Sequence, residues 1–535
     1  MTSTHSSSGD VNRRSFLKAS VAVGASAAAL SETAQPDAVQ AAYWPKPPRV
    51  ISIGSRRELF IDSHLIEQLK GAARQELHNP VARDQAIVHD APWEGNNCGY
   101  CSVFQDGYLY RMYYRGKQLS VVDGRLITNS HPEFYCYAES HDGIRWTKPD
   151  LGIVEFNGSK KNNIIWDGVG THNFSPFLDK RPGCPADQKY KALGGTMREG
   201  GLFAFASPDG IRWRLLRKKP VITNGAFDSQ NLAFWDEAAG CYRAYWRYFT
   251  KGITEQKVWK PAGLRAIRTA TSDDFFNWKN TANLVYEDSP EEHMYTNQVS
   301  PYHRAPHILV GFPMRYVERG WSPSMRALPE RAHREMRAES HIRYGTGLTE
   351  AQVMASRDGV HFKRWNDPFI PPGPERPDTW NYSHLGMATR PLETASDLPG
   401  ADRELSVYGK EGGWTGTSGS FRRYTLRLDG FVSVQAPLSG GEIVTRPLKF
   451  SGNRLELNVS TSAAGSVGVE IQDAEGRPID GFRLSDCREI FGDRLDAVVG
   501  WTAGPDVGRL AGRAVRLRFV VKDADLYAFR FVPGR

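Results

Sequence analysis

The chain has 535 residues, a formal net charge of +8, 51 glycines and 11% aromatic residues. This length exceeds one compact core, so we expect two ordered domains, and the glycine and aromatic content favours an all-β protein. The charge is mild for this size and no Lys/Arg-rich run occurs, which argues against a nucleic-acid partner, although an acidic polysaccharide is compatible with it.

Residues 1–41 predict a targeting segment. Arg13-Arg14-Ser15-Phe16-Leu17-Lys18 precedes an alanine-rich apolar stretch, and Val39-Gln40-Ala41 offers small residues for cleavage. Twin arginines followed by Phe-Leu-Lys are typical of the twin-arginine export signal. We therefore expect a periplasmic or extracellular protein. No later apolar run is long enough to span a bilayer, so we expect no membrane span.

A short phrase of serine, aspartate and an aromatic residue returns four times along the chain. Its copies are Ser140-His-Asp142-Gly143-Ile-Arg-Trp146, Ser207-Pro-Asp209-Gly210-Ile-Arg-Trp213, Ser272-Asp-Asp274-Phe-Phe-Asn-Trp278 and Ser356-Arg-Asp358-Gly359-Val-His-Phe362. Serine and aspartate side chains can bond to nearby backbone N–H groups and hold a turn. A phrase repeated at the interval of one four-stranded sheet is typical of a β-propeller. We interpret the phrase as a structural marker of blade hairpins.

A second repeat consists of five polar tracts that turn apolar. The tracts are 94–104, 171–177, 228–234, 293–302 and 379–385. Each is followed by ordinary strand patterns, so five tracts predict a five-bladed β-propeller over residues 55–437. The first strand of each blade lines the central channel, which would place the polar starts at one mouth of it.

The remaining segments have other patterns. Residues 440–535 alternate in the manner of a β-sandwich and lack the phrase. The segment Arg315–Arg343 is rich in Arg and Glu and is expected to form a helix or loop over one face. Cys98 and Cys101 have CxxC spacing without a second pair, so we expect neither a metal site nor a cofactor there. A calcium ion on the channel axis stays compatible with the sequence, although no ligand cluster specifies one.

A polar-mouthed five-bladed propeller followed by a β-sandwich resembles the glycoside hydrolase family 32 and 43 superfamily. Arg57-Glu-Leu-Phe-Ile-Asp62, Pro92-Trp-Glu94 and Asp523-Ala-Asp-Leu-Tyr-Ala-Phe-Arg-Phe531 also resemble exported, mostly uncharacterised bacterial members. The resemblance implies a carbohydrate substrate. The Trp-x-Asn-Asp-Pro motif of family 32 is absent, so roles here are argued from position rather than from motifs.

Glycoside hydrolysis usually needs two carboxyl groups facing one sugar, one protonated and one ionised. Candidates stand at the starts of the inner strands: Asp228, Glu94 and Glu292, with His293 as an alternative acid. The expected sugar-binding residues offer planar polar groups or flat rings. They are Trp93, His172, Asn173, Gln230, Asn231, Tyr295, Asn297, Asp378, Trp380 and Asn381.

The sequence supports three functions. The first is an exported glycoside hydrolase that removes terminal sugars, because a propeller channel forms a funnel. The second is a non-catalytic carbohydrate-binding propeller, which the missing family motifs favour. The third is a polysaccharide lyase, for which His293 and Tyr295 would act beside a neutralised uronate carboxylate.

Overall fold

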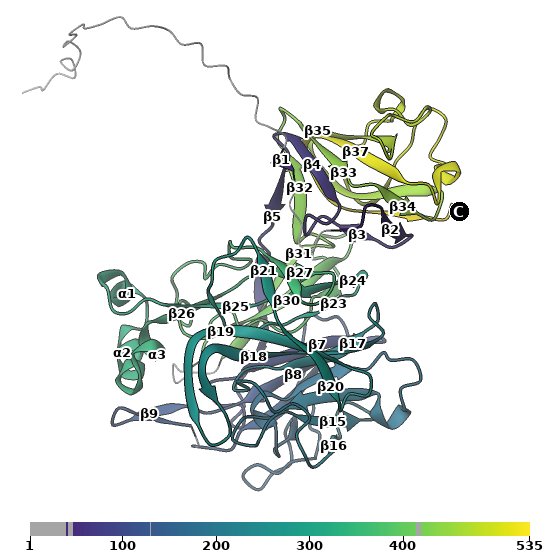
Figure 1. Cartoon of the computed structure of the whole chain (residues 1–535). Helices are drawn as coiled ribbons and strands as arrows, with labels where there is room; N and C mark the ends of the chain where they lie inside the picture. The colour runs from purple at the N-terminus through teal and green to yellow at the C-terminus, as the bar shows by residue number, and fades with distance from the viewer. Residues whose placement is uncertain (1–38, 41–46, 129, 414–418, 535) are drawn as a thin grey trace, which may run out of the picture.

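The structure is a computed structural model that describes residues 39–40, 47–128, 130–413 and 419–534. Within these ranges the chain is all-β apart from short helices, and a propeller lies beside a sandwich (Figure 1). The predicted fold class is confirmed. The predicted export signal lies outside the described residues except for β1 (Val39–Gln40). No described helix has the length and apolar character needed to cross a membrane.

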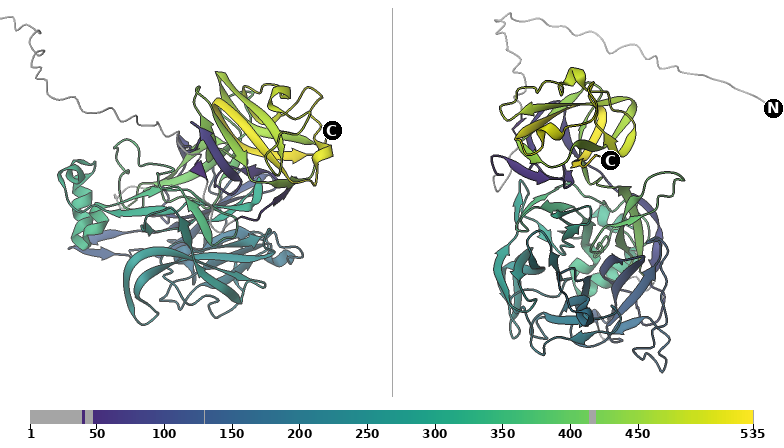
Figure 2. Two further views of the ribbon diagram at one scale, coloured as in Figure 1. Left: turned by 45° about the horizontal axis from the view of Figure 1, so that its top comes forward. Right: turned by 90° about the vertical axis from the view of Figure 1, so that its right-hand side faces the viewer.

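Five blades surround the axis in the described part of the chain, each with antiparallel strands ordered outwards. Figure 2 shows them from a second direction, in its right-hand view. From the axis outwards, the first blade consists of β7 (Gly99–Asp106), β8 (Leu109–Gly116), β11 (Phe134–Ser140) and β12 (Ile164–Trp166), and the second of β13 (Ser175–Leu178), β14 (Tyr190–Gly194), β15 (Phe203–Ser207) and β16 (Arg214–Leu215). The third consists of β17 (Leu232–Asp236), β18 (Cys241–Thr254), β19 (Trp259–Ser272) and β20 (Trp278–Asn283), and the fourth of β23 (Ser300–Tyr302), β24 (Ala305–Gly311), β27 (Met354–Ser356), β28 (His361–Arg364) and the parallel β21 (Val285–Glu287). The fifth consists of β29 (Leu392–Thr394), β30 (Glu404–Glu411), β31 (Ser420–Arg427) and β6 (Val81–Val88).

The ring is closed by a strand from the other end of the chain. β6 pairs antiparallel with β31 and supplies the outer strand of the fifth blade. β32, the strand that follows β31 in the chain, belongs to the sandwich rather than to this blade. Closure by an N-terminal strand removes the free edge of the last blade.

Each copy of the repeated phrase follows the third strand of a blade and holds a tight turn. In the first blade Ser140 Oγ accepts the Gly143 N–H at 2.9 Å, and Asp142 Oδ1 accepts the Ile144 and Arg145 N–H groups at 2.7 and 2.8 Å. The same bonds recur after Ser207, Ser272 and Ser356. The serine and aspartate therefore satisfy backbone donors, as the sequence predicted.

The sandwich combines both ends of the described chain. Its strands are β1, β2 (Ile51–Gly54), β3 (Glu58–Leu59), β4 (Ile66–Gly71), β5 (Arg74–Leu77), β32 (Val432–Ala436), β33 (Gly441–Thr445), β34 (Leu448–Phe450), β35 (Arg454–Asp473), β36 (Asp493–Val498) and β37 (Val515–Val532). The strand pairing thus places residues 51–77 and 432–436 with the sandwich, although the sequence had assigned 55–77 and 432–436 to the propeller range 55–437. β35 and β37 are long strands that stay paired through two irregularities of register.

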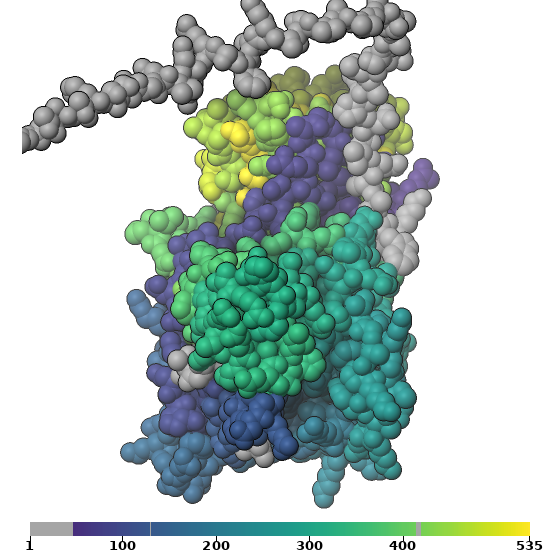
Figure 3. Space-filling model, turned by 90° about the vertical axis from the view of Figure 1, so that its left-hand side faces the viewer, coloured from purple at the N-terminus to yellow at the C-terminus, as the bar shows by residue number. Residues whose placement is uncertain are grey.

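Two insertions cover one mouth of the propeller. α1 (Pro323–Ala327), α2 (Arg331–Ser340) and α3 (Ile342–Thr346) confirm the expectation of a helical insertion, and α2 contacts the hairpin β9 (Ser120–Val122) and β10 (Arg125–Ile127). Figure 3 shows this side, with the green helices above the blue hairpin. A small sheet of β22 (His293–Met294), β25 (Met314–Glu318) and β26 (Gly347–Ala351) connects the helices to the fourth blade. All six cysteines are free thiols.

Candidate active site

A pocket of about 230 Å³ lies at the mouth under these insertions, and we call it the mouth pocket. It is formed where the inner strands begin, as the five tracts predicted, together with the ends of second strands and the insertions. Its polar lining consists of Asn97, Tyr100, Arg115, Lys117, Thr128, His172, Asp228, Gln230, Tyr295, Thr296, Gln298, Arg343, Tyr344, Tyr382, Ser383 and Lys410.

Asp228 is the one carboxylate among the lining residues of the described chain. It precedes β17, its side chain is 50% exposed, and it forms an ion pair with the buried Arg247. Its backbone carbonyl accepts the Tyr100 hydroxyl at 2.9 Å. The Arg247 guanidinium also lies 4.9 Å from the centre of the Tyr295 ring. The carboxylate is therefore both positioned and open to the pocket.

A second carboxylate, Glu133, stands behind the lining. It forms an ion pair with Lys117, and its Oε2 lies 2.9 Å from His172 Nδ1. Burial alone would raise the pKa of Glu133, but contacts with His172, Arg115 and Lys117 outweigh it and hold that pKa well below its usual range. Burial lowers the pKa of His172 in spite of Glu133, so the imidazole is neutral at pH 7. Glu133 therefore orients His172 rather than serving as a proton donor.

Lys410 is a buried amine at the pocket wall. It is the penultimate residue of β30, is 4% exposed, and donates to Asn97 Oδ1 at 2.7 Å and to Ser383 Oγ at 3.2 Å. Burial, with a further contribution from Arg115, lowers the pKa of Lys410 to about 7. An amine with this pKa can donate or accept a proton at neutral pH.

Tyr295 and Tyr382 are two further ionisable groups in the lining of the mouth pocket. The ring of Tyr295 lies 5.8 Å from that of Tyr382. Burial would raise the pKa of the Tyr295 phenol, but Arg247, a hydrogen bond with Tyr382 and two further arginines outweigh it and lower that pKa. The pKa of Tyr382 is raised, chiefly by burial, so Tyr382 keeps its proton.

The predicted residues divide into two groups. Asp228, His172, Gln230 and Tyr295 are brought together in the mouth pocket. The others lie outside its lining: Trp93, Glu94, Asn173, Asn231, Glu292, His293, Asn297, Asp378, Trp380 and Asn381.

Glu94 and Glu292, the other two predicted carboxylates, are tied to basic partners. Glu94 is fully buried, accepts the Tyr114 hydroxyl at 2.5 Å and pairs with Lys148 at 2.8 Å. Glu292 pairs with Arg315 at 3.3 Å and with Arg364 at 3.0 Å. Both carboxylates therefore have structural partners outside the mouth pocket.

The remaining predicted residues mostly bond to neighbouring groups, as follows. His293 Nδ1 accepts the backbone N–H of Arg265, the Trp93 indole donates to Asn163, and the Trp380 indole donates to the Gly373 carbonyl. The side chains of Asn173 and Asn231 both donate to the Ser229 carbonyl, and that of Asn297 accepts the Val299 N–H. The backbone N–H of Asp378 donates to Glu330, and Asn381 is buried beside Thr349.

The sequence reasoning missed the basic residues of the site. Arg115 and Lys410 stand near the ends of the second strands β8 and β30, Arg247 lies where the second strand β18 runs past the start of β17, and Arg343 comes from α3. A second strand runs antiparallel to the inner strand, so its end lies beside the mouth, as the pairing of Gly99 with Arg115 shows. A basic residue at that position in three blades was a signal that could have been used.

No family model matches the chain. A curated relative, the uncharacterized protein Rv1502 of Mycobacterium tuberculosis (strain ATCC 25618 / H37Rv), is 29% identical over 125 residues, which cover 22% of this chain and 34% of that protein. A second, the uncharacterized protein MT1551 of strain CDC 1551 / Oshkosh, matches to the same extent. The match thus spans about a third of the relatives' length.

Several solved structures are similar in fold. One is a glycoside hydrolase family 43 arabinoxylan arabinofuranohydrolase from Bacillus subtilis, at 13% identity, covering 85% of this chain and 99% of that chain with a TM-score of 0.36. Another is a family 32 β-fructofuranosidase from Bombyx mori, at 11% identity, covering 86% of this chain and 95% of that chain with a TM-score of 0.35. A third is an N-acetylgalactosamine deacetylase from F. plautii, at 14% identity, covering 67% of this chain and 94% of that chain with a TM-score of 0.37. At these TM-scores the similarities carry no argument about chemistry, which must come from this chain's own residues.

Proposed function

We propose that this chain is an exported glycoside hydrolase that removes a terminal acidic sugar bound in the mouth pocket. The observation that carries the proposal is the charge of the lining, where Arg115, Lys117, Arg343 and Lys410 face a single carboxylate, Asp228. Such a site attracts and orients an anion. Its volume of 230 Å³ is below the roughly 300–1,000 Å³ of pockets for drug-sized ligands, which favours one terminal sugar.

In the hydrolytic route Asp228 is the ionised carboxylate at the sugar. It acts as the base that activates water or as the nucleophile. Lys410 takes the place of the second carboxyl group and protonates the leaving oxygen, since its pKa of about 7 suits a proton donor at neutral pH. Arg115 and Arg343 hold the sugar carboxylate.

A second candidate function, β-elimination, is favoured by Tyr295. This phenol lies under Arg247 and Arg265, whose guanidinium carbons are 4.9 and 5.6 Å from the ring centre. As a phenolate it would remove the proton next to a uronate carboxylate. The electron pair forms a carbon–carbon double bond, the glycosidic C–O bond breaks, and Lys410 protonates the departing oxygen. Arginines neutralising the carboxylate would stabilise the intermediate charge.

The test is a product analysis on acidic and neutral oligosaccharides: oligogalacturonate, oligoglucuronate, arabino-oligosaccharide and fructo-oligosaccharide. Hydrolysis adds the mass of water across the products, whereas elimination leaves an unsaturated product that absorbs in the ultraviolet. We expect a free terminal uronate from the wild type, its loss in Asp228→Asn, and its retention in the exposed control Asp150→Asn.

Three results would argue against hydrolysis of an acidic sugar. Unsaturated products that persist in Asp228→Asn but vanish in Tyr295→Phe would establish elimination. Cleavage of only the neutral oligosaccharides would remove the role of the basic lining. Binding without products across the panel would favour the non-catalytic carbohydrate-binding propeller.

A further inference from the structure

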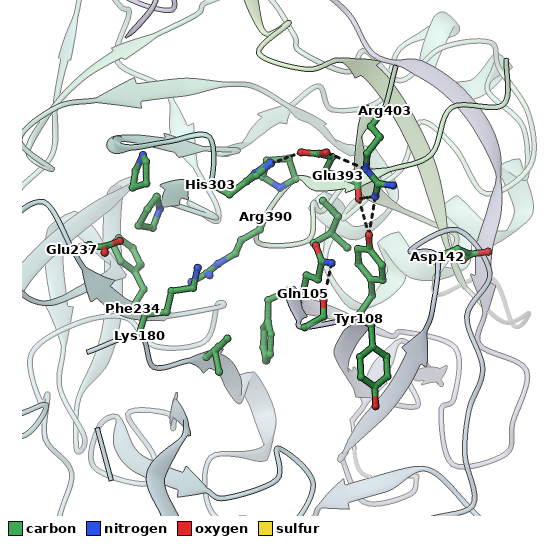
Figure 4. Close-up of a pocket in the computed structure, with 18 of the residues that line it drawn as sticks. Gln105, Tyr108, Asp142, Lys180, Phe234, Glu237, His303, Arg390, Glu393 and Arg403 are labelled. Atoms are coloured by element: carbon green, nitrogen blue, oxygen red, sulfur yellow. Dashed lines mark hydrogen bonds and ion pairs between the residues drawn. The ribbon is translucent and has the colours of Figure 1, made fainter. Parts of the chain in front are cut away.

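A second, larger pocket lies at the other end of the propeller axis. We call this cavity of about 750 Å³ the distal pocket. All five blades contribute to it through the ends of their inner strands or the residues just after them, including Gln105, Lys180, Glu237, His303 and Glu393 (Figure 4). It therefore lies on the same central axis as the mouth pocket, but at the opposite face of the propeller.

A buried polar layer separates the two pockets. Gln298 Nε2 donates to Gln230 Oε1 at 2.7 Å, and Gln230 Nε2 donates to Ser102 Oγ at 3.1 Å. Gln298 also reaches the Met387 carbonyl, and all three polar side chains are at most 1% exposed. A ligand in the distal pocket would therefore not reach the mouth pocket through the axis.

The distal pocket contains two basic side chains that no described acidic residue neutralises. Arg390 and Lys180 come from the fifth and second blades and point into the pocket in Figure 4. Within the described residues neither forms an ion pair or side-chain hydrogen bond. Burial lowers the pKa of Arg390 to about 10, which still leaves it charged at pH 7. Arg390 is partly buried and Lys180 is exposed, so both cations are open to a ligand, and an anion between them would gain charge-assisted contacts.

The carboxylates of the pocket are occupied or peripheral. Glu393 pairs with Arg403 at 3.0 Å and with His303 at 3.4 Å. Asp142 accepts the backbone N–H groups of its hairpin turn. Glu237 is exposed, in the third blade. The charge at the centre of the pocket is consequently positive.

Flat aromatic surfaces border these cations. Tyr108 is 81% exposed and stacks on His141, with ring centres 6.2 Å apart and planes 9° from parallel. Trp235, in β17 of the third blade, also lines the pocket. An exposed aromatic face beside a cation fits the apolar face of a sugar ring that carries a carboxylate.

We propose that the distal pocket is a second binding site for an acidic sugar, in which Arg390 and Lys180 bind the carboxylate and the aromatic rings bind the sugar face. The site is independent of bond cleavage at the mouth. It would hold a second segment of an acidic polymer on the far side of the propeller.

The test uses D-galacturonate as the probe, because this single acidic sugar has no glycosidic bond to cleave, and D-galactose as its neutral counterpart. Trp235 lines the distal pocket and no tryptophan lines the mouth pocket, so the part of the tryptophan fluorescence change that Trp235→Phe removes reports on the distal site. Calorimetry gives the stoichiometry. The variants are Arg390→Gln and Lys180→Gln, with the exposed Lys218→Gln as the matched control and Arg115→Gln to remove the mouth site.

We expect galacturonate, and not galactose, to change the fluorescence of the wild type, Lys218→Gln and Arg115→Gln. Arg390→Gln should weaken this response at least about tenfold, since a charge-assisted bond is lost. Cleavage of short substrates by Arg390→Gln should equal that of the wild type. The proposal is overturned if Arg390→Gln binds as the wild type does, if galactose binds equally, or if the response disappears in Arg115→Gln.

Discussion

Arg357 joins the propeller to the sandwich through two buried carboxylates. It follows Ser356 in the fourth copy of the repeated phrase, and its guanidinium contacts Glu58 Oε2 at 2.7 Å and Asp62 Oδ2 at 2.8 Å. The side chains are 9%, 0% and 2% exposed, respectively. Burial alone would raise the pKa of Glu58, but Arg357 and His307 outweigh it and hold it far below its usual range.

We predict that Arg357→Met lowers the free energy of unfolding by about 3 kcal/mol. Removing one partner of a buried ion pair costs roughly 3–5 kcal/mol, because the other charge stays buried. The lower end applies here, since Arg56 at 2.6 Å and His307 at 3.2 Å remain beside Glu58. Methionine keeps the aliphatic volume, so packing changes little.

The assay is urea unfolding followed by tryptophan fluorescence, with limited proteolysis to detect separate opening of the two domains. The control is Arg212→Met, which breaks an exposed ion pair with Asp209 in the second copy of the phrase and should cost at most about 1 kcal/mol. A loss below about 1 kcal/mol for Arg357→Met would refute the reasoning, as would equal losses in both variants.

Three further predictions follow from other residues. The depressed pKa of Glu58 stabilises the fold at pH values above its unfolded value of about 4.3, and this contribution is lost as the pH falls below that value. Glu58→Gln should therefore lower the free energy of unfolding at pH 7, and that free energy should fall less between pH 7 and pH 3 than it does in the wild type, measured by urea unfolding at both pH values. Lys410→Met should lower kcat/KM about 10²- to 10⁴-fold and abolish the loss of activity above pH 7, measured as a pH–rate profile. Glu94→Gln should destabilise the chain by about 1.5–3 kcal/mol in urea while the activity per folded molecule stays unchanged, because Glu94 bonds to Lys148 and Tyr114 rather than to the pocket.

Local patterns in the sequence predicted the architecture well. The phrase works through bonds that span two or three residues, such as Asp142 to Arg145, so its role is readable without the fold. The polar tracts predicted the mouth because they directly precede the inner strands. The placement of Asp228 and Tyr295 in one pocket follows from that register alone.

Long-range pairing was not readable in the same way. β6 completes the fifth blade across more than 300 residues of sequence, and β3, β4 and β5 join the sandwich by pairing with β37, β33 and β32, respectively. The alternation of a strand does not identify its partner. The basic lining was missed for a related reason, since Arg115 and Lys410 reach the mouth only because second strands run back towards it.

The direction of the strands also explains why the two axial pockets differ. The first and third strands of each blade start at the mouth and end at the distal face, so every copy of the repeated phrase lies at the distal face. There, its serine and aspartate side chains accept hydrogen bonds from the backbone of the turn. Of the four copies of the phrase, only His141 and Asp142 of the first line the distal pocket. Its unpartnered cations, Lys180 and Arg390, stand at positions outside the phrase. Since the turns do not require these residues, a role in binding is the physical reason we assign to them.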